Sequence, residues 1–284
     1  MKQKKITAFS VVVFIVLALW SLALLSLLVW GLMASVKEQF FDFRINVLGL
    51  PKELYFENYL TVWKHIEEVV QFSYVELIFN TLIICLIASV GGTFFPCLIG
   101  YLVAKYPCKF SNIFYWVALI AMSLPIVGAF PAELDMLRKL GVYNTFFSVV
   151  FQKATYLGLY FFVFSAVFKS ISNDFYDAAS IDGATDFGIF FKIMLPMVIA
   201  TLGTVFLLTF VAYWNDYQYA LMYIPDKPTL SYGTYVLSNA TLQDLNNTPV
   251  KMAACFMLIV PVLIIFIIFK DKMMANLSMG GLKE

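Results

Sequence analysis

The sequence LIFNTLIICLIASVGGTFFPCLIGYLVA, residues 77–104, decides the fold class, because none of its side chains carries a charge. An α-helix rises about 1.5 Å per residue, so roughly 20 apolar residues cross the hydrocarbon core of a bilayer. Backbone groups inside a bilayer find no water, and a helix satisfies them within its own segment. This stretch therefore predicts a transmembrane α-helix.

Five further runs have the same character. The six predicted spans are Ile6–Val36, Leu77–Ala104, Phe110–Ala132, Ala154–Phe168, Ile193–Asn215 and Met252–Phe269. The fourth run is short, but the uncharged residues 144–152 precede it, with only Lys153 between them. A lysine near a helix end can extend its ammonium group to the interface, so this run counts as a span. The pattern predicts an all-α integral membrane protein with six transmembrane helices.

Composition supports this class and argues against an enzyme. Hydrophobic residues make up 62% of the 284 residues and charged residues 13%, against about 25% charged in soluble domains. The net charge of +1 gives no basic field for nucleic acid. His65 is the only histidine, and the four cysteines form no CxxC pair. Histidine-based metal sites and Ser-His-Asp or Cys-His catalytic groups therefore lack their parts.

The two ends of the chain bear on its orientation. Three lysines precede the first run, as in a signal peptide, but the apolar part of such a peptide spans only about 7–15 residues. The charge-free run Ile6–Val36 is longer, so we expect a retained anchor. Six spans place both termini on one side, with ten Lys and Arg residues there and nine on the other. The ten crowd into short tails and one short loop, which predicts cytoplasmic termini and a cytoplasmic Cys108.

The spans offer no energy source of their own. Ion-coupled carriers place ionisable residues within the membrane, whereas Glu133, Lys153 and Asp216 stand only at the edges of these runs. The chain also contains no GxxxxGK[ST] phosphate-binding loop. If the chain moves a solute uphill, a partner must supply the energy.

The polar segment between the fourth and fifth spans reads SNDFYDAASIDGA at residues 172–184. Asp174 can cap a helix there, and Asp177 in the first turn suits the helix dipole. The alanines keep the helix narrow for close approach to another surface, Gly183 can end it, and Pro196 can open the next span. An ordinary amphipathic helix at the membrane interface remains the alternative.

The pattern Asp177-Ala178-Ala179-x-x-Asp182-Gly183-Ala184, followed by Ile193-x-Leu195-Pro196, resembles the EAA loop of bacterial ABC importer permeases, with Asp177 where the family usually has Glu. Further motifs fall in the order expected for the carbohydrate branch, and the chain is most similar to the smaller permease of maltose-type importers. These motifs are Asn58-Tyr59-Leu60, Asn80-Thr81-Leu82, Leu140–Thr145, Trp214-Asn215-Asp216 and Met279–Lys283.

The resemblance implies a type I importer permease in a bacterial cytoplasmic membrane, importing a sugar or oligosaccharide. Residues 1–76 would form a first helix and outer loop. Residues 77–284 would form the five-helix core, with the coupling loop at 169–196 and a cytoplasmic tail. The implied partners are a second permease, two ABC ATPase subunits that bind the ATP and Mg, and an extracytoplasmic solute-binding protein. This chain itself would bind no cofactor and no metal.

The resemblance also assigns roles to residues. The residues that would couple the permease to the ATPase are Asp177, Ala178, Ala179, Asp182, Gly183 and Ala184. The tail residues that would contact the ATPase dimer are Gly280, Gly281 and Lys283. The loop Pro225–Pro249 would touch the binding protein. By their residue types Trp214, Asn215, Asp216 and Tyr217 form a possible substrate path, because aromatic faces and amides bind polyols. A structural belt is the favoured interpretation, because Trp and Tyr gather at membrane interfaces.

Three alternative functions are compared with this one. The same architecture could import another solute, such as a polyamine, phosphate or an osmolyte. A stand-alone secondary carrier is opposed by the small size of the chain and by the missing intramembrane charges. A membrane sensor or assembly factor would leave the EAA-like loop unexplained.

Overall fold

A computed structural model describes residues 8–106, 109–124, 128–153, 157–242 and 244–279. Every regular element in these ranges is helical, as the sequence predicts. The chain divides into two compact units. The first unit comprises residues 1–74 and 233–261, and the second comprises residues 75–232 and 262–284.

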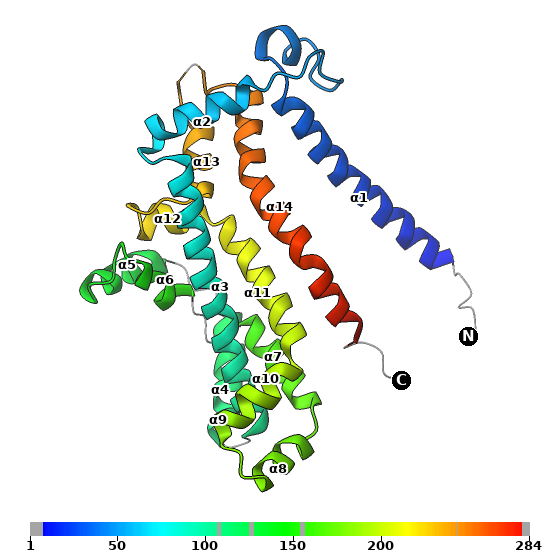
Figure 1. Cartoon of the computed structure of the whole chain (residues 1–284), viewed down its shortest axis with the longest axis vertical. Helices are drawn as coiled ribbons and strands as arrows, with labels where there is room; N and C mark the ends of the chain where they lie inside the picture. The colour runs from blue at the N-terminus through cyan, green and yellow to red at the C-terminus, as the bar shows by residue number, and fades with distance from the viewer. Residues whose placement is uncertain (1–7, 107–108, 125–127, 154–156, 243, 280–284) are drawn as a thin grey trace. The chain divides into compact units, whose positions relative to one another are not determined.

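The first unit contains a long apolar helix followed by a folded polar segment. Its elements are α1 (Ala8–Ser35), the π-helical turn η1 (Gln39–Phe43), α2 (Glu57–Val70), the end of α13 (Leu230–Ser238) and the start of α14 (Thr248–Met279) (Figure 1). Nearly all side chains of α1 are exposed, and most are apolar. Apolar exposure along a whole helix is what lipid contact requires.

A buried lysine fixes the segment that follows α1. Lys37 is fully buried, and its Nζ donates hydrogen bonds to the carbonyl oxygens of Asn46 at 2.5 Å and Gly49 at 2.6 Å. Asn58 of α2 donates from Nδ2 to the carbonyl oxygens of Ser35 and Lys37. A buried charge is tolerated only when hydrogen bonds replace its water, so Lys37 ties residues 46–49 to the end of α1.

The second unit carries most of the helices. They are α3 (Tyr74–Lys105), α4 (Lys109–Ser123), α5 (Ala129–Lys139), α6 (Phe146–Lys153), α7 (Leu159–Ser170), α8 (Asp174–Ile181), α9 (Asp186–Ile189), η2 (Phe190–Met194), α10 (Leu195–Met197), α11 (Ile199–Trp214) and α12 (Tyr217–Tyr223). In one of its hydrophobic cores the Tyr101 ring packs on Phe168 and Phe190, at centroid distances of 5.3 and 4.9 Å. At Gly100 an added Cβ would lie 2.8 Å from Phe164 Cβ, so only glycine allows α3 to approach α7 this closely.

Three helices of the described residues are long and apolar enough to cross a membrane, namely Phe9–Ser35, Tyr74–Lys105 and Thr248–Ile268. A fourth results if Asp186–Met197 and Ile199–Trp214, which meet at an angle of 76°, count as one broken span. Two further apolar helices, Phe110–Ser123 and Leu159–Ser170, are shorter than these. The first, second and sixth predicted spans thus appear as single long helices.

The third and fifth predicted runs are each interrupted. The run Phe110–Ala132 does not form one helix, because α4 ends at Ser123 and α5 begins at Ala129, after Gly128 with φ of +82°. Pro196 does not open the fifth span as predicted. It lies in α10, after the π-helical turn η2, and α11 starts only at Ile199. Proline and π-helical turns both interrupt the regular hydrogen-bond ladder, which accounts for the bend.

Candidate functional site

The predicted coupling helix is present as α8, and Figure 1 shows it at the lower end of the second unit, beyond α7. Its N-cap is Asn173, so the prediction that Asp174 caps the helix is wrong by one residue. Ser172 supports this end, because its Oγ donates to Asp174 Oδ2 at 2.8 Å and accepts from the Asp174 backbone N–H. Asp177 lies in the first turn as predicted, where a negative charge suits the helix dipole.

A glycine turn ends α8. Gly183 has φ of +79°, the backbone N–H of Ala184 donates to the Ala179 carbonyl, and that of Gly183 donates to the Ser180 carbonyl. This pair of bonds is the Schellman arrangement, which satisfies the last carbonyls of a helix and needs a left-handed residue. The prediction that Gly183 ends the helix is confirmed. An added Cβ at Gly183 would meet no atom of this chain within 4 Å.

The surface of α8 is open and partly apolar. Among the six predicted coupling residues Ala179 is buried, while Asp177, Ala178, Asp182, Gly183 and Ala184 are exposed. Three large apolar side chains stand beside them, with exposed fractions of 50% for Phe175, 86% for Ile181 and 78% for Phe187. The prediction of the coupling surface rested on the small residues and did not include these three, although large apolar residues inside a polar segment are visible in the sequence. Exposed apolar side chains rimmed by polar ones are typical of protein interaction sites.

Polar contacts tie α8 to its neighbours. The hydroxyls of Tyr106 and Tyr176 both donate to Asp186 Oδ1 at 2.8 Å, and the two tyrosine rings meet edge to face at 5.7 Å. Burial, followed by the hydrogen bonds with Tyr176 and Asp186, raises the pKa of the Tyr106 hydroxyl, which therefore stays protonated as a donor. Lys105 Nζ donates to the Ile171 carbonyl at 2.6 Å. These contacts link α8 to the end of α3, to the end of α7 and to α9.

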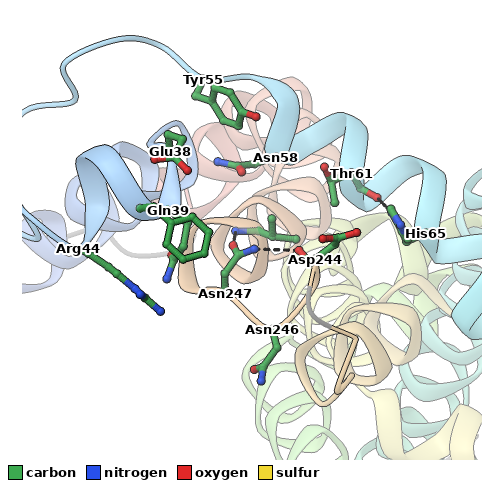
Figure 2. Close-up of a pocket in the computed structure, with 12 residues that line it drawn as sticks. Glu38, Gln39, Arg44, Tyr55, Asn58, Thr61, His65, Asp244, Asn246 and Asn247 are labelled. Atoms are coloured by element: carbon green, nitrogen blue, oxygen red, sulfur yellow. Dashed lines mark hydrogen bonds between the residues drawn. The ribbon is translucent and has the colours of Figure 1, made fainter.

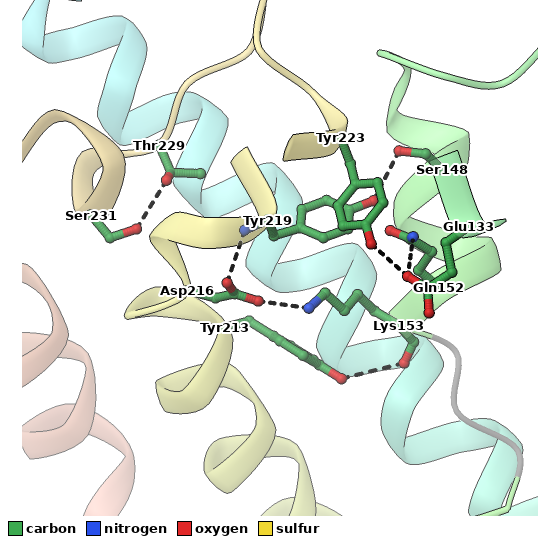
Figure 3. Close-up of polar contacts among 10 residues, drawn as sticks. All are labelled: Glu133, Ser148, Gln152, Lys153, Tyr213, Asp216, Tyr219, Tyr223, Thr229 and Ser231. Atoms are coloured by element: carbon green, nitrogen blue, oxygen red, sulfur yellow. Dashed lines mark hydrogen bonds and ion pairs between the residues drawn. The ribbon is translucent and has the colours of Figure 1, made fainter. Parts of the chain in front are cut away.

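A second group of polar residues, which we call the polar junction, joins α5, α6 and α12 with the end of α11 (Figure 3). Lys153 Nζ lies 2.6 Å from Asp216 Oδ2, with side-chain exposures of 22% and 25%. Asp216 Oδ1 accepts from the backbone N–H of Tyr219 and so caps α12. The Lys153 ammonium also faces the rings of Tyr213 and Tyr219, at 5.2 and 4.6 Å from their centroids, a favourable cation–π geometry.

The polar junction continues to Glu133 on α5. Its Oε2 accepts a hydrogen bond from the Tyr223 hydroxyl at 2.5 Å and another from Gln152 Nε2 at 3.2 Å. In the sequence Glu133, Lys153 and Asp216 stand separately at the edges of predicted spans, whereas the fold brings all three into the polar junction. Their opposite charges were the only signal available, and nothing in the sequence specified which of them pair.

The four residues proposed from sequence for a substrate path lie beside this network. Trp214 is fully buried and its ring packs on Phe210 at 5.8 Å. Asn215 donates from Nδ2 to the Val211 carbonyl of its own helix. Asp216 is engaged by Lys153, and Tyr217 begins α12.

The first unit contains a separate polar pocket of about 440 Å³ (Figure 2). Its lining includes Glu38, Arg44 and Asn58, together with Asp244 and Asn247 of the loop before α14. Asn247 holds this loop, since its Oδ1 accepts from the Val250 N–H and its Nδ2 donates to the Asp244 carbonyl. Part of the predicted contact loop Pro225–Pro249 thus borders a polar hollow. Gly280, Gly281 and Lys283 of the tail lie outside the described residues.

Comparison with known proteins places these features in a family. Residues 97–273 match the family model described as binding-protein-dependent transport system inner membrane component. The arabinooligosaccharides transport system permease protein AraQ of Halalkalibacterium halodurans is 31% identical over 206 residues, covering 72% of each chain. The diacetylchitobiose uptake system permease protein NgcG of Streptomyces coelicolor is 26% identical over 267 residues, covering 93% of this chain and 86% of the relative.

A solved structure has the same fold. A chain of a bacterial ABC transporter involved in the import of the acidic polysaccharide alginate aligns with a TM-score of 0.73 and 20% identity. The alignment covers 95% of this chain and 99% of that chain.

Proposed function

This chain belongs to the family of binding-protein-dependent transport system inner membrane components, and from that premise we propose that it forms half of the pore of an ATP-driven importer. A second permease would form the other half, two cytoplasmic ATPase subunits would bind ATP and Mg, and a solute-binding protein would deliver the cargo. ATP hydrolysis would take place on the partner. The absence of a GxxxxGK[ST] phosphate-binding loop from this sequence supports the assignment of ATP hydrolysis to the partner subunit.

The proposed cargo is a sugar or oligosaccharide. The relatives that support this choice are described as permeases for arabinooligosaccharides, for diacetylchitobiose and, in Bacillus subtilis, for melibiose, raffinose and stachyose. A polyamine, phosphate or an osmolyte remains the alternative cargo.

The observation that carries the proposed coupling role is the surface of α8. It is a short helix with a fixed glycine end, and it exposes Phe175 and Ile181 next to Asp177 and Asp182. Docking into a groove of another protein is a common use for a short helix with exposed apolar anchors. The contacts of Tyr106 and Lys105 would carry the resulting displacement to α3.

The function can be tested on the reconstituted complex. Proteoliposomes containing both permeases and the ATPase should accumulate a radiolabelled oligosaccharide only when the loaded binding protein is outside and ATP is inside. A panel of neutral oligosaccharides, a polyamine, phosphate and glycine betaine identifies the cargo class. Uptake of one of the three non-sugar solutes, with no uptake of any carbohydrate, would contradict the proposed cargo.

We further propose six membrane spans with both termini in the cytoplasm. The three long helices, the broken span and the two shorter apolar helices would supply the six. Cys108, which lies outside the described residues, should then react with a membrane-impermeant maleimide in inverted vesicles and not in intact cells. The variant Cys108→Ser gives the background from the other three cysteines. Labelling of Cys108 in intact cells would overturn this topology.

The remaining partner contacts are also proposals. The tail residues Gly280, Gly281 and Lys283 would contact the ATPase dimer, and the loop Pro225–Pro249 would meet the binding protein. The polar pocket beside Asp244 and Asn247 supports the second role, because it offers hydrogen-bonding groups to an incoming surface.

A further inference from the structure

A cavity of about 380 Å³ opens next to the polar junction, between α5, α6 and α12 of the second unit. The residues that line it include Phe130, Glu133, Gln152, Lys153, Tyr219 and Tyr223. Its volume falls within the range of about 300–1,000 Å³ that is usual for small-molecule sites. Phe130 and Phe151 at its edge are 47% and 53% exposed, so the cavity is accessible from outside this chain.

The walls of the cavity combine aromatic rings with polar groups. The rings of Phe130 and Tyr223 stack at 6.2 Å with an interplanar angle of 27°, and Tyr219 packs on Tyr223 at 5.2 Å. Aromatic rings with a few fixed polar groups are the usual lining of an organic ligand site. The negative face of an aromatic ring suits the C–H face of a sugar ring.

One acceptor in the cavity wall has no donor. Gln152 Oε1 is buried and accepts no hydrogen bond within the described chain, although the same side chain donates from Nε2 to Glu133. An unsatisfied buried acceptor is unfavourable, so a turn of the Gln152 side chain that brings Oε1 to a ligand hydroxyl in the cavity is favourable.

The charges disfavour an acidic ligand. Asp216 neutralises Lys153 at 2.6 Å. The Glu133 carboxylate is hydrogen-bonded by Tyr223 and Gln152, and it forms no ion pair with any described residue. The cavity therefore carries one uncompensated carboxylate, which opposes entry of an acidic sugar.

We propose that this cavity, enclosed by Phe130, Tyr223, Gln152 and Glu133, is a binding subsite for one neutral sugar ring of the cargo. This inference rests on the proposed carbohydrate function and adds a place and a charge preference to it. The Gln152 amide oxygen accepts a hydrogen bond from a sugar hydroxyl, the exposed Phe130 ring covers a C–H face, and Lys153, which is paired with Asp216, forms one side of the subsite.

The test uses the complete complex, trapped with ADP and vanadate after loading with a radiolabelled neutral oligosaccharide that the wild type imports. Gln152→Leu removes the free acceptor, and we expect the trapped complex to retain about ten-fold less sugar, because a lost hydrogen bond to a buried group costs on the order of 1–3 kcal/mol. Gln218→Leu is the matched control, since Gln218 is an exposed glutamine of α12 that does not line the cavity. Glu133→Gln should increase retention of a uronic-acid analogue relative to the neutral sugar.

A second measurement on the wild type does not depend on the folding of any variant. A diazirine derivative of the same sugar, activated in the trapped complex, should label peptides of α5, α6 or α12. Labels found only elsewhere, or Gln152→Leu and Glu133→Gln complexes that retain sugars as the wild type does, would overturn the subsite. Failure of the proposed function itself would look different, because the wild-type complex would then import no carbohydrate at all.

Discussion

The glycine that ends α8 allows a sharp test of coupling. Gly183 has φ of +79° in open space, so a side chain at this position clashes with nothing in this chain. The cost of a substitution is then the cost of the left-handed backbone, about 1–2 kcal/mol for an ordinary residue and less for asparagine. Helix ends open at little free-energy cost. Gly183→Ala can therefore reduce the population of molecules in which the glycine turn at the end of α8 is formed, which we call the closed turn, by up to about 5–30-fold.

If the partner binds only molecules with the closed turn, its apparent affinity falls by the same factor as the population of the closed turn. We therefore expect Gly183→Ala to weaken binding of the ATPase by several-fold, and Gly183→Asn to stay within about two-fold of the wild type, although its side chain is larger. Gly183→Trp combines the backbone cost with bulk and should be weakest. The assay titrates the ATPase onto the permease pair in nanodiscs, and uptake per ATP hydrolysed is measured in proteoliposomes.

The order of the variants decides between two explanations. If binding falls with side-chain size, so that asparagine is worse than alanine, then occupied contact space matters and the backbone argument is refuted. If all three variants bind and couple as the wild type does, the role assigned to α8 is wrong.

Three further predictions concern other parts of the chain. Ile181→Ser should weaken ATPase binding about ten-fold, because an isoleucine buried at an interface contributes about 1.5–3 kcal/mol. The control Ile45→Ser, at an exposed isoleucine of the first unit, should leave ATPase binding unchanged, and equal effects of the two substitutions would contradict docking at α8. Lys153→Met should lower the melting temperature of the protein, because it leaves the partly buried Asp216 carboxylate unpaired. Adding Asp216→Asn to this variant should restore part of the lost melting temperature, whereas additive losses from the two substitutions would show that the ion pair is not coupled. Deleting Asp244–Asn247 should reduce stimulation of ATP hydrolysis by the binding protein without affecting assembly, and unchanged stimulation would exclude this loop from docking.

The features that sequence predicted correctly are local ones. A charge-free run such as Leu77–Ala104 specifies a helix by its length and composition alone, and α3 contains all of it. Gly183 was predictable because a left-handed residue after a short polar helix is a property of a few neighbouring residues.

The features that sequence missed depend on distant contacts. Lys153 and Asp216 are 63 positions apart, and their pairing follows from how α6 approaches the end of α11. In the sequence Lys37 looks like an ordinary charged residue of a loop, yet its side chain is fully buried and donates hydrogen bonds to two carbonyl oxygens. The bend near Pro196 was also missed, because a proline can either open a helix or follow a π-helical turn that breaks one.

Helix α3 connects the two candidate sites of the second unit. At its C-terminal end Lys105 holds the Ile171 carbonyl beside the coupling helix. Closer to its middle, an added Cβ on Gly92 would lie 3.2 Å from both the Lys153 carbonyl oxygen and the Tyr213 hydroxyl. A close-packed contact cannot absorb a shift of its backbone without moving its partners. We therefore expect a displacement of α8 that moves α3 along its axis to displace Lys153 and Tyr213 too, and with them one side of the proposed sugar subsite.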